Sequence, residues 1–514
     1  MLQQVRQRQN LRRRRSRPPE WLIRLAAGSR RFRTLIGTRF PQWLIQHREE
    51  LTMAVLSFLM HLCIALLMAW WVLPPDTTDS LFSLLVTNET DADEPDLVVD
   101  VEQILQTETL KDLSVNSSLK QMLSDLNEDV AAENLPSEVE REFAVDLEPT
   151  NAEMESLFRQ GEFGGRTASG KQAALKKYGG TAESERAVNA GLKWLQSIQR
   201  KNGSWSFADV GPEAEPGRFA RAEAGATSLS LLCFLAAGHT HRRDGPYRDT
   251  VMNGLKFLGS QAEVSRNTAD FRGGSEGNSP MYVHALASLC LSEAHAMEPD
   301  DDELTQATRM AVDFIERSQD SSGGGWRYRP GQAGDTSVTG WQIMALQSAK
   351  AGGIRVSSTT LRKARQFLQS VQTEKDGSAY SYVPDQRAKI SMTAVALLCR
   401  MYFGWKQDHE GLQKGVARLS AAGPHRSDIY FNYYATQVLH HWGGDQWKKW
   451  NQELREQLVR TQVTDGPAAG TWPPADPHAD AGGTLYQTTL SILTLEVYYR
   501  HLPLYYEPQS GPDE

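Results

Sequence analysis

The sequence predicts an all-α protein in which six inner and six outer helices form a closed double ring. Two observations carry this prediction. A pattern of helix, glutamine and glycine-containing turn recurs along residues 180–507. Two kinds of helix also alternate there, one apolar on nearly all sides and one apolar on a single face, and the first kind must be buried on most sides. Before this region, the sequence predicts one transmembrane helix and a disordered acidic linker.

Charge divides the 514 residues into three parts. Residues 1–50 contain 13 Arg and 3 acids, residues 76–155 contain 22 acids and 3 bases, and the remainder contains 39 bases and 38 acids. Partners therefore have to be considered separately for each part. The chain has 4 Cys and is 40% hydrophobic, which excludes a small scaffold held by disulfides.

The N-terminal part has the pattern of a membrane anchor. Residues 51–73 are 23 consecutive uncharged residues, which reach ~34 Å as a helix. A cleaved signal peptide has a shorter apolar region and a small-residue cleavage site. Because the arginines precede the span, we expect residues 1–50 to form a basic cytoplasmic head and residues 74–514 to lie in the periplasm or another space outside the cytoplasm. The head has no interleaved aromatics, so it fits anionic lipid better than nucleic acid.

Residues 74–179 form the predicted linker. Short apolar clusters stand in a strongly acidic background, and self-repulsion with low hydrophobicity favours disorder. The simplest interpretation is a tether. The alternative is a stretch that binds a protein partner and folds on contact. A short tail is expected at residues 508–514.

The repeat is clearest in three segments, each with a small residue, an aromatic, Leu or Ile, a Gln and then a glycine-containing turn with an aromatic. Their markers are Gln199 with Trp205, Gln319 with Trp326, and Gln372 with Tyr380. We expect an outer helix to end at each Gln and the aromatic to pack over the turn. Outer helices are predicted near 184–199, 247–261, 303–319, 358–372, 408–421 and 445–462. Inner helices are predicted at 224–238, 281–295, 335–351, 390–404, 428–442 and 484–500.

This pattern resembles the QW repeat of terpenoid (squalene and oxidosqualene) cyclases and of protein prenyltransferase β-subunits. The resemblance covers residues 180–507 and implies an (α/α)6 toroid. Squalene–hopene cyclases carry a D-x-D-D-T-A acid motif, and residues 332–337 keep only the last of its three aspartates, as Asp335. The neighbouring carboxylates that help to set the protonation state of the acid are therefore missing. The zinc ligands of protein prenyltransferases have no counterpart, and we expect no metal and no cofactor.

Asp335 has two interpretations. It can be the N-cap of an inner helix, where its carboxylate accepts from backbone N–H groups. It can also be the general acid of an isoprenoid cyclase or prenyl-transfer enzyme. The incomplete motif favours the cap.

If the inner helices run alike, their starts converge at one mouth. Five aromatics in the first two turns are then expected to line a cavity there: Tyr282, Trp341, Tyr430, Tyr434 and Tyr486. Such aromatics suit a carbocation or a polyprenyl chain, although they could instead fill the centre of a solid ring. The favoured function is a membrane-tethered binding or scaffold domain, or an enzyme of divergent activity, with an isoprenoid or other lipid as ligand. The alternative is an isoprenoid cyclase or prenyl-transfer enzyme that uses Asp335 as its acid.

Overall fold

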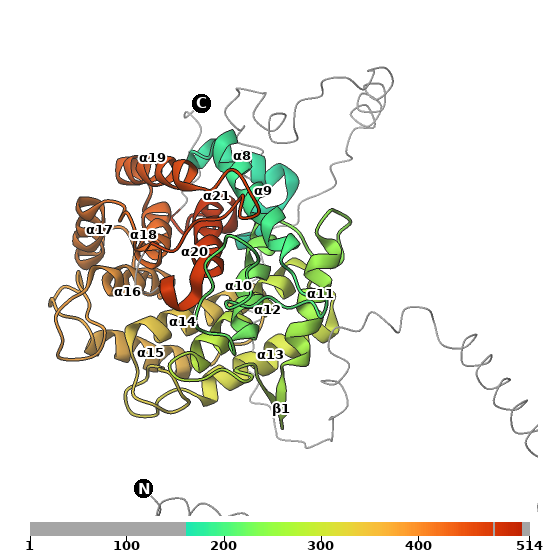
Figure 1. Ribbon diagram of the computed structural model, residues 1–514. Coiled ribbons are helices and arrows are strands. Elements are labelled where there is room, and N and C mark those ends of the chain that lie inside the picture. Colours follow the sequence, from blue (N-terminus) through green and yellow to red (C-terminus); the bar gives the residue numbers. More distant parts are fainter. Residues whose placement is uncertain (1–160, 476–478, 506–514) are drawn as a thin grey trace, which may run out of the picture. The chain divides into compact units, whose positions relative to one another are not determined.

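The structure is a computed structural model that describes residues 161–475 and 479–505 (Figure 1). The basic head, the expected span at 51–73, the linker up to residue 160 and the tail at 508–514 lie outside the described residues. Among the residues that are described, none of the helices is long and apolar enough to cross a membrane. The described residues all belong to one compact unit.

Six apolar helices form the inner ring. Each contacts the next, and the last contacts the first, so the ring is closed. Their bounds are α10 (Glu223–Ala236), α12 (Pro280–Met297), α14 (Thr336–Ala351), α16 (Ile390–Tyr402), α18 (Ile429–Trp442) and α20 (Ala479–Leu495). In α10 every residue from Ala224 to Ala236 is buried, as expected for a helix enclosed on all sides. The predicted closed ring is therefore confirmed in this part of the chain.

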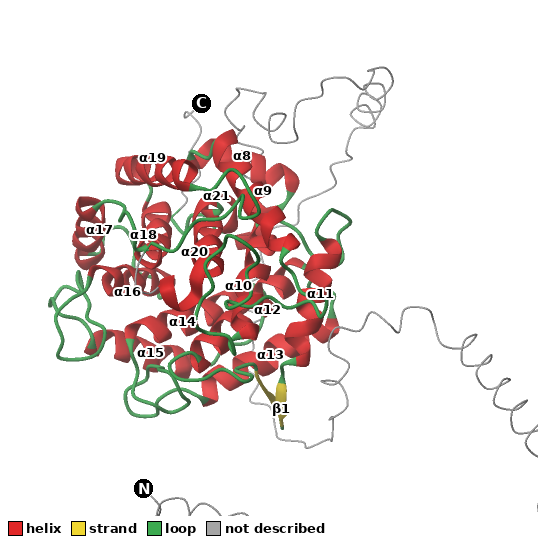
Figure 2. Cartoon of the chain, viewed as in Figure 1, coloured by secondary structure: helices red, strands yellow, loops and turns green. Residues whose placement is uncertain are grey.

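The outer helices surround this ring (Figure 2), and there are six of them among the described residues. They are α9 (Ala182–Ser197), α11 (Arg248–Ser260), α13 (Asp302–Arg317), α15 (Ser358–Ser370), α17 (Glu410–Ala422) and α19 (Gly444–Thr461). Each buries one face; in α13 the buried positions include Leu304, Ala307, Ala311 and Ile315, spaced by three or four residues. The predicted outer helices are confirmed to within two residues at either end.

The sequence analysis is wrong at two places. Residues 161–178 were assigned to the disordered linker, but they form the short helix η3 (Gly161–Arg166) and α8 (Ala168–Tyr178), which pack against α21 (Val497–Arg500). The last inner helix was predicted as one piece over 484–500, but α20 ends at Leu495 and the separate α21 follows it. Gly483, whose φ of 62° is not helical, interrupts α20 just before the predicted start. A short hairpin of β1 (Glu263–Ser265) and β2 (Thr268–Asp270) was not anticipated.

The turns after three outer helices repeat the same hydrogen bonds. In each, the tryptophan ring donates to a carbonyl near the end of the preceding outer helix, and its backbone N–H donates to a threonine hydroxyl on the following inner helix. The three sets are Trp205 with Leu195 (2.7 Å) and Thr227 (3.1 Å), Trp326 with Ile315 (2.8 Å) and Thr339 (3.0 Å), and Trp472 with Leu458 (2.8 Å) and Thr488 (3.1 Å). Each turn therefore joins an outer helix to an inner one.

The glutamines join neighbouring outer helices. Gln199 Nε2 donates to a carbonyl in its own turn (Gly203, 3.0 Å) and to Thr250 O of the next outer helix (2.9 Å). Gln319 repeats this, with Gly324 O at 2.8 Å and Thr360 O at 2.9 Å. Gln372 differs, because its amide donates only within its own turn, to Glu374 and Lys375.

Candidate functional site

A cavity of about 580 Å³ opens at the N-terminal ends of the inner helices. All six inner helices contribute to its lining: Gly225 of α10, Tyr282 of α12, Ser337 of α14, Ser391 of α16, Tyr430 of α18 and Tyr486 of α20. The inner helices therefore all run in the same direction, and their N-terminal ends converge at this cavity. The volume lies within the range of ~300–1,000 Å³ that is usual for small-molecule sites.

Four of the five expected aromatics line this cavity: Tyr282, Trp341, Tyr430 and Tyr486. Tyr434 is fully buried behind them, with its ring centroid 5.0 Å from Tyr430 and 5.6 Å from Trp341. At this end the aromatics surround a space, and Tyr434 supports two of the rings that line it.

Hydroxyl groups form two short chains in the wall. Tyr282 OH donates to Ser337 Oγ at 2.8 Å, and Ser337 Oγ is 2.6 Å from Tyr430 OH. Tyr328 OH and Tyr382 OH are also 2.6 Å apart. Burial raises the pKa of Tyr282 and Tyr430 well above the usual value, so both phenols stay protonated. The wall can thus offer neutral hydrogen-bonding groups to the polar end of a ligand.

The two ends of the cavity differ in polarity. Lys389 and Asp428 stand at the starts of α16 and α18, and the Lys389 ammonium lies 5.8 Å from the Tyr382 ring centroid. Deeper positions on the inner helices are apolar, among them Leu229 and Leu286. A ligand with an apolar body and a polar end matches this arrangement.

The segment between α9 and α10 closes one side of the mouth. Its residues 215–218 are held to the start of α20 by backbone hydrogen bonds, including Thr484 N to Glu215 O (2.9 Å) and Arg218 N to Ala481 O (2.8 Å). The same segment brings Phe207 and Phe219 into the lining, and the Phe219 side chain is 38% exposed. An apolar side chain thus stands at the entrance.

Asp335 is the N-cap of α14. Its Oδ1 accepts from the Val338 backbone N–H at 2.8 Å, and Arg327 Nε lies 3.7 Å from Oδ2. The carboxylate is 0% exposed, and the residues that line the cavity do not include it. Burial raises its pKa to about 6, outweighing the Val338 N–H, the Tyr382 hydroxyl and the Arg327 guanidinium, which lower it. Tyr382 links this carboxylate to the cavity, because its side chain interacts with Asp335 and also lines the cavity.

We expect Asp335→Asn to preserve the cap and to remove a pH dependence of stability. The folded carboxyl has the higher pKa, so the folded state binds more protons than the unfolded state between about pH 4 and pH 6, and stability falls as the pH rises through this window. From about pH 4 to about pH 7.5, the difference in unfolding free energy between the Asn variant and the wild type should shift by roughly 2 kcal/mol in favour of the variant. Urea unfolding at both pH values measures it.

Asp428→Asn is the matched control, because Asp428 caps α18 with a hydrogen bond of the same length, accepting from Phe431 N at 2.8 Å. It reports the effect of losing a capping carboxylate by itself. An Asp335→Asn difference that is the same at both pH values would show that the buried carboxyl does not titrate as the structure indicates.

Sequence reasoning missed several residues of the cavity. Phe207, Tyr328 and Tyr382 each stand two positions after the aromatic of a repeat turn, and all three line the cavity. That shared position was a usable signal, since the repeat itself was recognised. Lys389 carried no comparable signal, because a lysine before an apolar helix is usually solvent-exposed.

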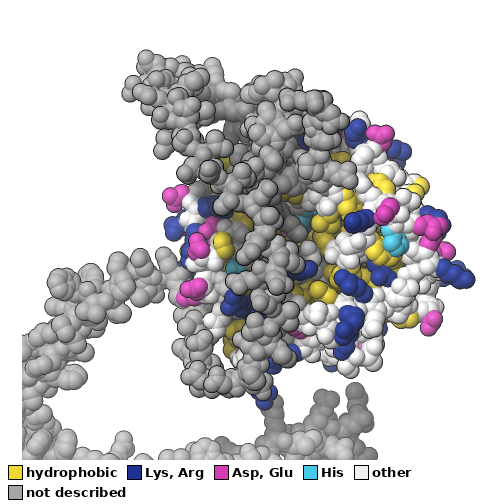
Figure 3. Space-filling model, turned by 180° about the vertical axis from the view of Figure 1, so that it is seen from behind, with side chains coloured by type: hydrophobic (Ala, Val, Ile, Leu, Met, Phe, Trp, Pro, Cys, Tyr) yellow, Lys and Arg dark blue, Asp and Glu magenta, His cyan; other side chains and the backbone are white. Residues whose placement is uncertain are grey.

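Elsewhere on the described surface, acidic and basic side chains are interspersed on the face shown in Figure 3. The residues that the structure describes contain no group of three or more His, Cys, Asp or Glu side chains that could hold a metal ion. Cys233, Cys290 and Cys399 are buried and free, and burial raises the pKa of each thiol.

Comparison with known proteins gives distant matches. No protein-family model and no curated protein matches the chain. Among solved structures, a variant of the type II terpene cyclase MstE from Scytonema in complex with geranylgeranyl dihydroxybenzoate is 13% identical with a TM-score of 0.40, covering 62% of this chain and 96% of the cyclase. An inactive α-1,6-mannanase variant from Salegentibacter in complex with α-1,6-mannotetrose is 11% identical with a TM-score of 0.41, covering 62% and 98%. Similarities this distant, to proteins of unlike chemistry, give no argument about the activity of this chain.

Proposed function

We propose that this protein is a membrane-tethered binding domain whose toroid holds an isoprenoid or a similar apolar molecule with one polar end. The observation that carries the proposal is the cavity of about 580 Å³, with an apolar interior and hydroxyl and charged groups toward its mouth. The expected span at residues 51–73 and the acidic stretch after it would connect the toroid to a membrane, from which such a ligand is drawn.

The geometry of Asp335 favours binding over acid catalysis. A general acid must reach the atom that it protonates. The Asp335 carboxylate is instead fully buried, caps α14 and is not part of the cavity lining. A second candidate remains, an isoprenoid cyclase or related enzyme, and it is supported by the pKa of about 6 and by Tyr382, which interacts with the carboxylate and lines the cavity.

Photolabelling with a diazirine derivative of geranylgeraniol tests the proposal on the full chain in detergent. We expect mass spectrometry to locate the label on peptides that line the cavity. Ser391→Trp places a bulky ring in the mouth from a half-buried position and should reduce this labelling about tenfold. Ser358→Trp, at the exposed start of α15, makes the same change on the outer ring and should leave labelling unchanged.

Labelling that is equal in both variants, or spread over the outer helices, would contradict binding in the cavity. Incubation with squalene and polyprenyl diphosphates separates the two candidates. Product formed by the wild type and abolished by Asp335→Asn would establish the enzyme, because an amide cannot supply the acidic proton.

A further inference from the structure

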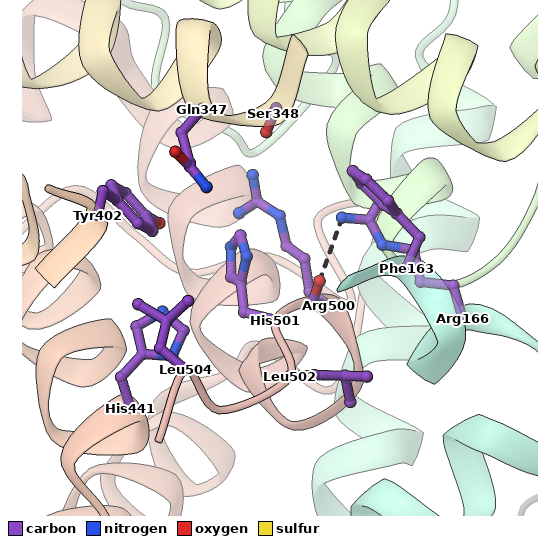
Figure 4. Close-up of a pocket in the computed structure, with 10 residues that line it drawn as sticks. All are labelled: Phe163, Arg166, Gln347, Ser348, Tyr402, His441, Arg500, His501, Leu502 and Leu504. Carbon is purple, nitrogen blue, oxygen red and sulfur yellow. Dashed lines mark hydrogen bonds between the residues drawn. The ribbon is translucent and has the colours of Figure 1, made fainter. Parts of the chain in front are cut away.

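A second pocket lies at the opposite end of the ring, where the inner helices end (Figure 4). Its volume is about 20 Å³, which is room for one water-sized atom. It is lined by side chains from η3, α14, α16, α18 and α21, among them Arg166, Ser348, Tyr402, His441 and Arg500. This pocket plays no part in the function proposed above.

The charged lining of this pocket is entirely basic. Arg166 and Arg500 are 3% and 1% exposed, and the lining includes no acidic residue. The two guanidiniums share a single carboxylate behind the pocket, with Arg166 Nη1 2.8 Å from Glu293 Oε2 and Arg500 Nη2 2.9 Å from Glu293 Oε1. Two buried positive charges therefore face one negative charge.

Two other acids, Glu185 and Glu496, lie near these charges. Glu185 is paired with Lys171 at 2.7 Å. Glu496 is fully buried, and burial raises its pKa well above the usual value despite Lys171, Arg500 and Arg166, which lower it. Neither Glu185 nor Glu496 is among the residues that line the pocket.

Residues that line the pocket also carry hydrogen-bond donors without acceptors. Arg500 Nε, Arg166 Nε and both ring nitrogens of His441 have no hydrogen-bond partner among the described residues, and His441 is only 3% exposed. Burial lowers the pKa of His441 well below its usual value, so the ring is neutral and carries one N–H. Buried donors in folded proteins are nearly always paired, so an acceptor in this pocket would satisfy these groups.

We propose that this pocket binds a small monovalent anion the size of chloride. The charged residues of the lining are all basic, which excludes a metal cation, and the volume excludes a phosphate or a larger carboxylate. The unpaired N–H groups of the lining residues supply the donors. The anion would lie between η3 and the end of α21, and so would fasten the point where the chain enters the toroid to the last part of the ring.

Chloride binding to the full chain in detergent tests this proposal. We expect the thermal midpoint to rise when chloride replaces gluconate at constant ionic strength, because gluconate is too large for the pocket. We also expect the protein to broaden the chloride NMR signal. Added bromide should reverse this broadening by competing for the pocket. Ser348→Leu fills the pocket from α14 without touching the ion pairs, and Arg166→Gln removes one of the two positive charges; each should weaken chloride binding at least about tenfold.

Lys350→Gln is the matched control, because it removes a positive charge from the exposed side of the same helix, two residues from Ser348. It should leave both readouts unchanged. If Arg166→Gln does not fold, Ser348→Leu alone decides. Chloride and gluconate that act equally on the wild type, or broadening that persists in Ser348→Leu, would overturn the proposal.

Discussion

Replacing Trp326 with alanine is expected to lower the free energy of unfolding by about 3–5 kcal/mol. The indole is 1% exposed, so the change removes a large buried side chain and leaves a cavity. It also leaves the Ile315 carbonyl without the ring N–H that donates to it at 2.8 Å. Urea unfolding of the full chain, followed by circular dichroism, measures the effect.

Two further variants help to interpret this loss of stability: one separates the hydrogen bond from the ring, and the other is a control. Trp326→Phe keeps most of the ring and removes the hydrogen bond, so it should cost only about 1 kcal/mol. Trp405→Ala removes a half-buried tryptophan that stacks on His409 and packs beside Gly377, and its effect should be smaller than that of Trp326→Ala. Equal midpoints for the two alanine variants would mean that the turn tryptophans do not join the two rings of helices.

The helices could be predicted because one cause, burial, sets both their pattern and their packing. The inner helices are apolar on all sides since they are enclosed by neighbours, and the outer helices bury one stripe. Both patterns are local in sequence. The convergence of Tyr282, Trp341, Tyr430 and Tyr486 followed from the same reasoning, because helices that run alike bring their first turns together.

What the sequence did not reveal depends on contacts between distant residues. Residues 161–178 are too polar to show a helical stripe, and they are held by ion pairs to the ring, such as Arg166 with Glu293 and Lys171 with Glu185. Neither partner could be known before the fold. The complete burial of Asp335, which raises its pKa, is also a property of the surrounding elements and leaves no mark on the local sequence.

The ion cluster at the end of the ring leads to a second large effect. Glu293→Gln keeps the shape of the side chain and leaves Arg166 and Arg500 buried without their shared carboxylate. Removing one partner of a buried ion pair costs about 3–5 kcal/mol, because the remaining charge has lost its compensation. The free energy of unfolding should be measured in gluconate buffer, since an anion in the adjacent pocket would offset part of the missing negative charge.

An exposed pair provides the control for this loss. Glu183→Gln breaks a contact of 2.9 Å with Arg186, in which both side chains are about half exposed, and should change stability by less than ~1 kcal/mol.

The pH dependence of the Glu293→Gln effect gives a further check. Burial raises the pKa of Glu293, but Arg166 and Arg500 outweigh it and hold the pKa below the usual 4.5. The stabilisation by the carboxylate is therefore complete above pH 4.5 and is lost as the pH falls below it. The difference in unfolding free energy between wild type and Glu293→Gln should be constant at neutral pH and should decrease in acid. A gap as small as that of Glu183→Gln would show that the two arginines are solvated, and that they neither fasten η3 to the ring nor need a counter-ion.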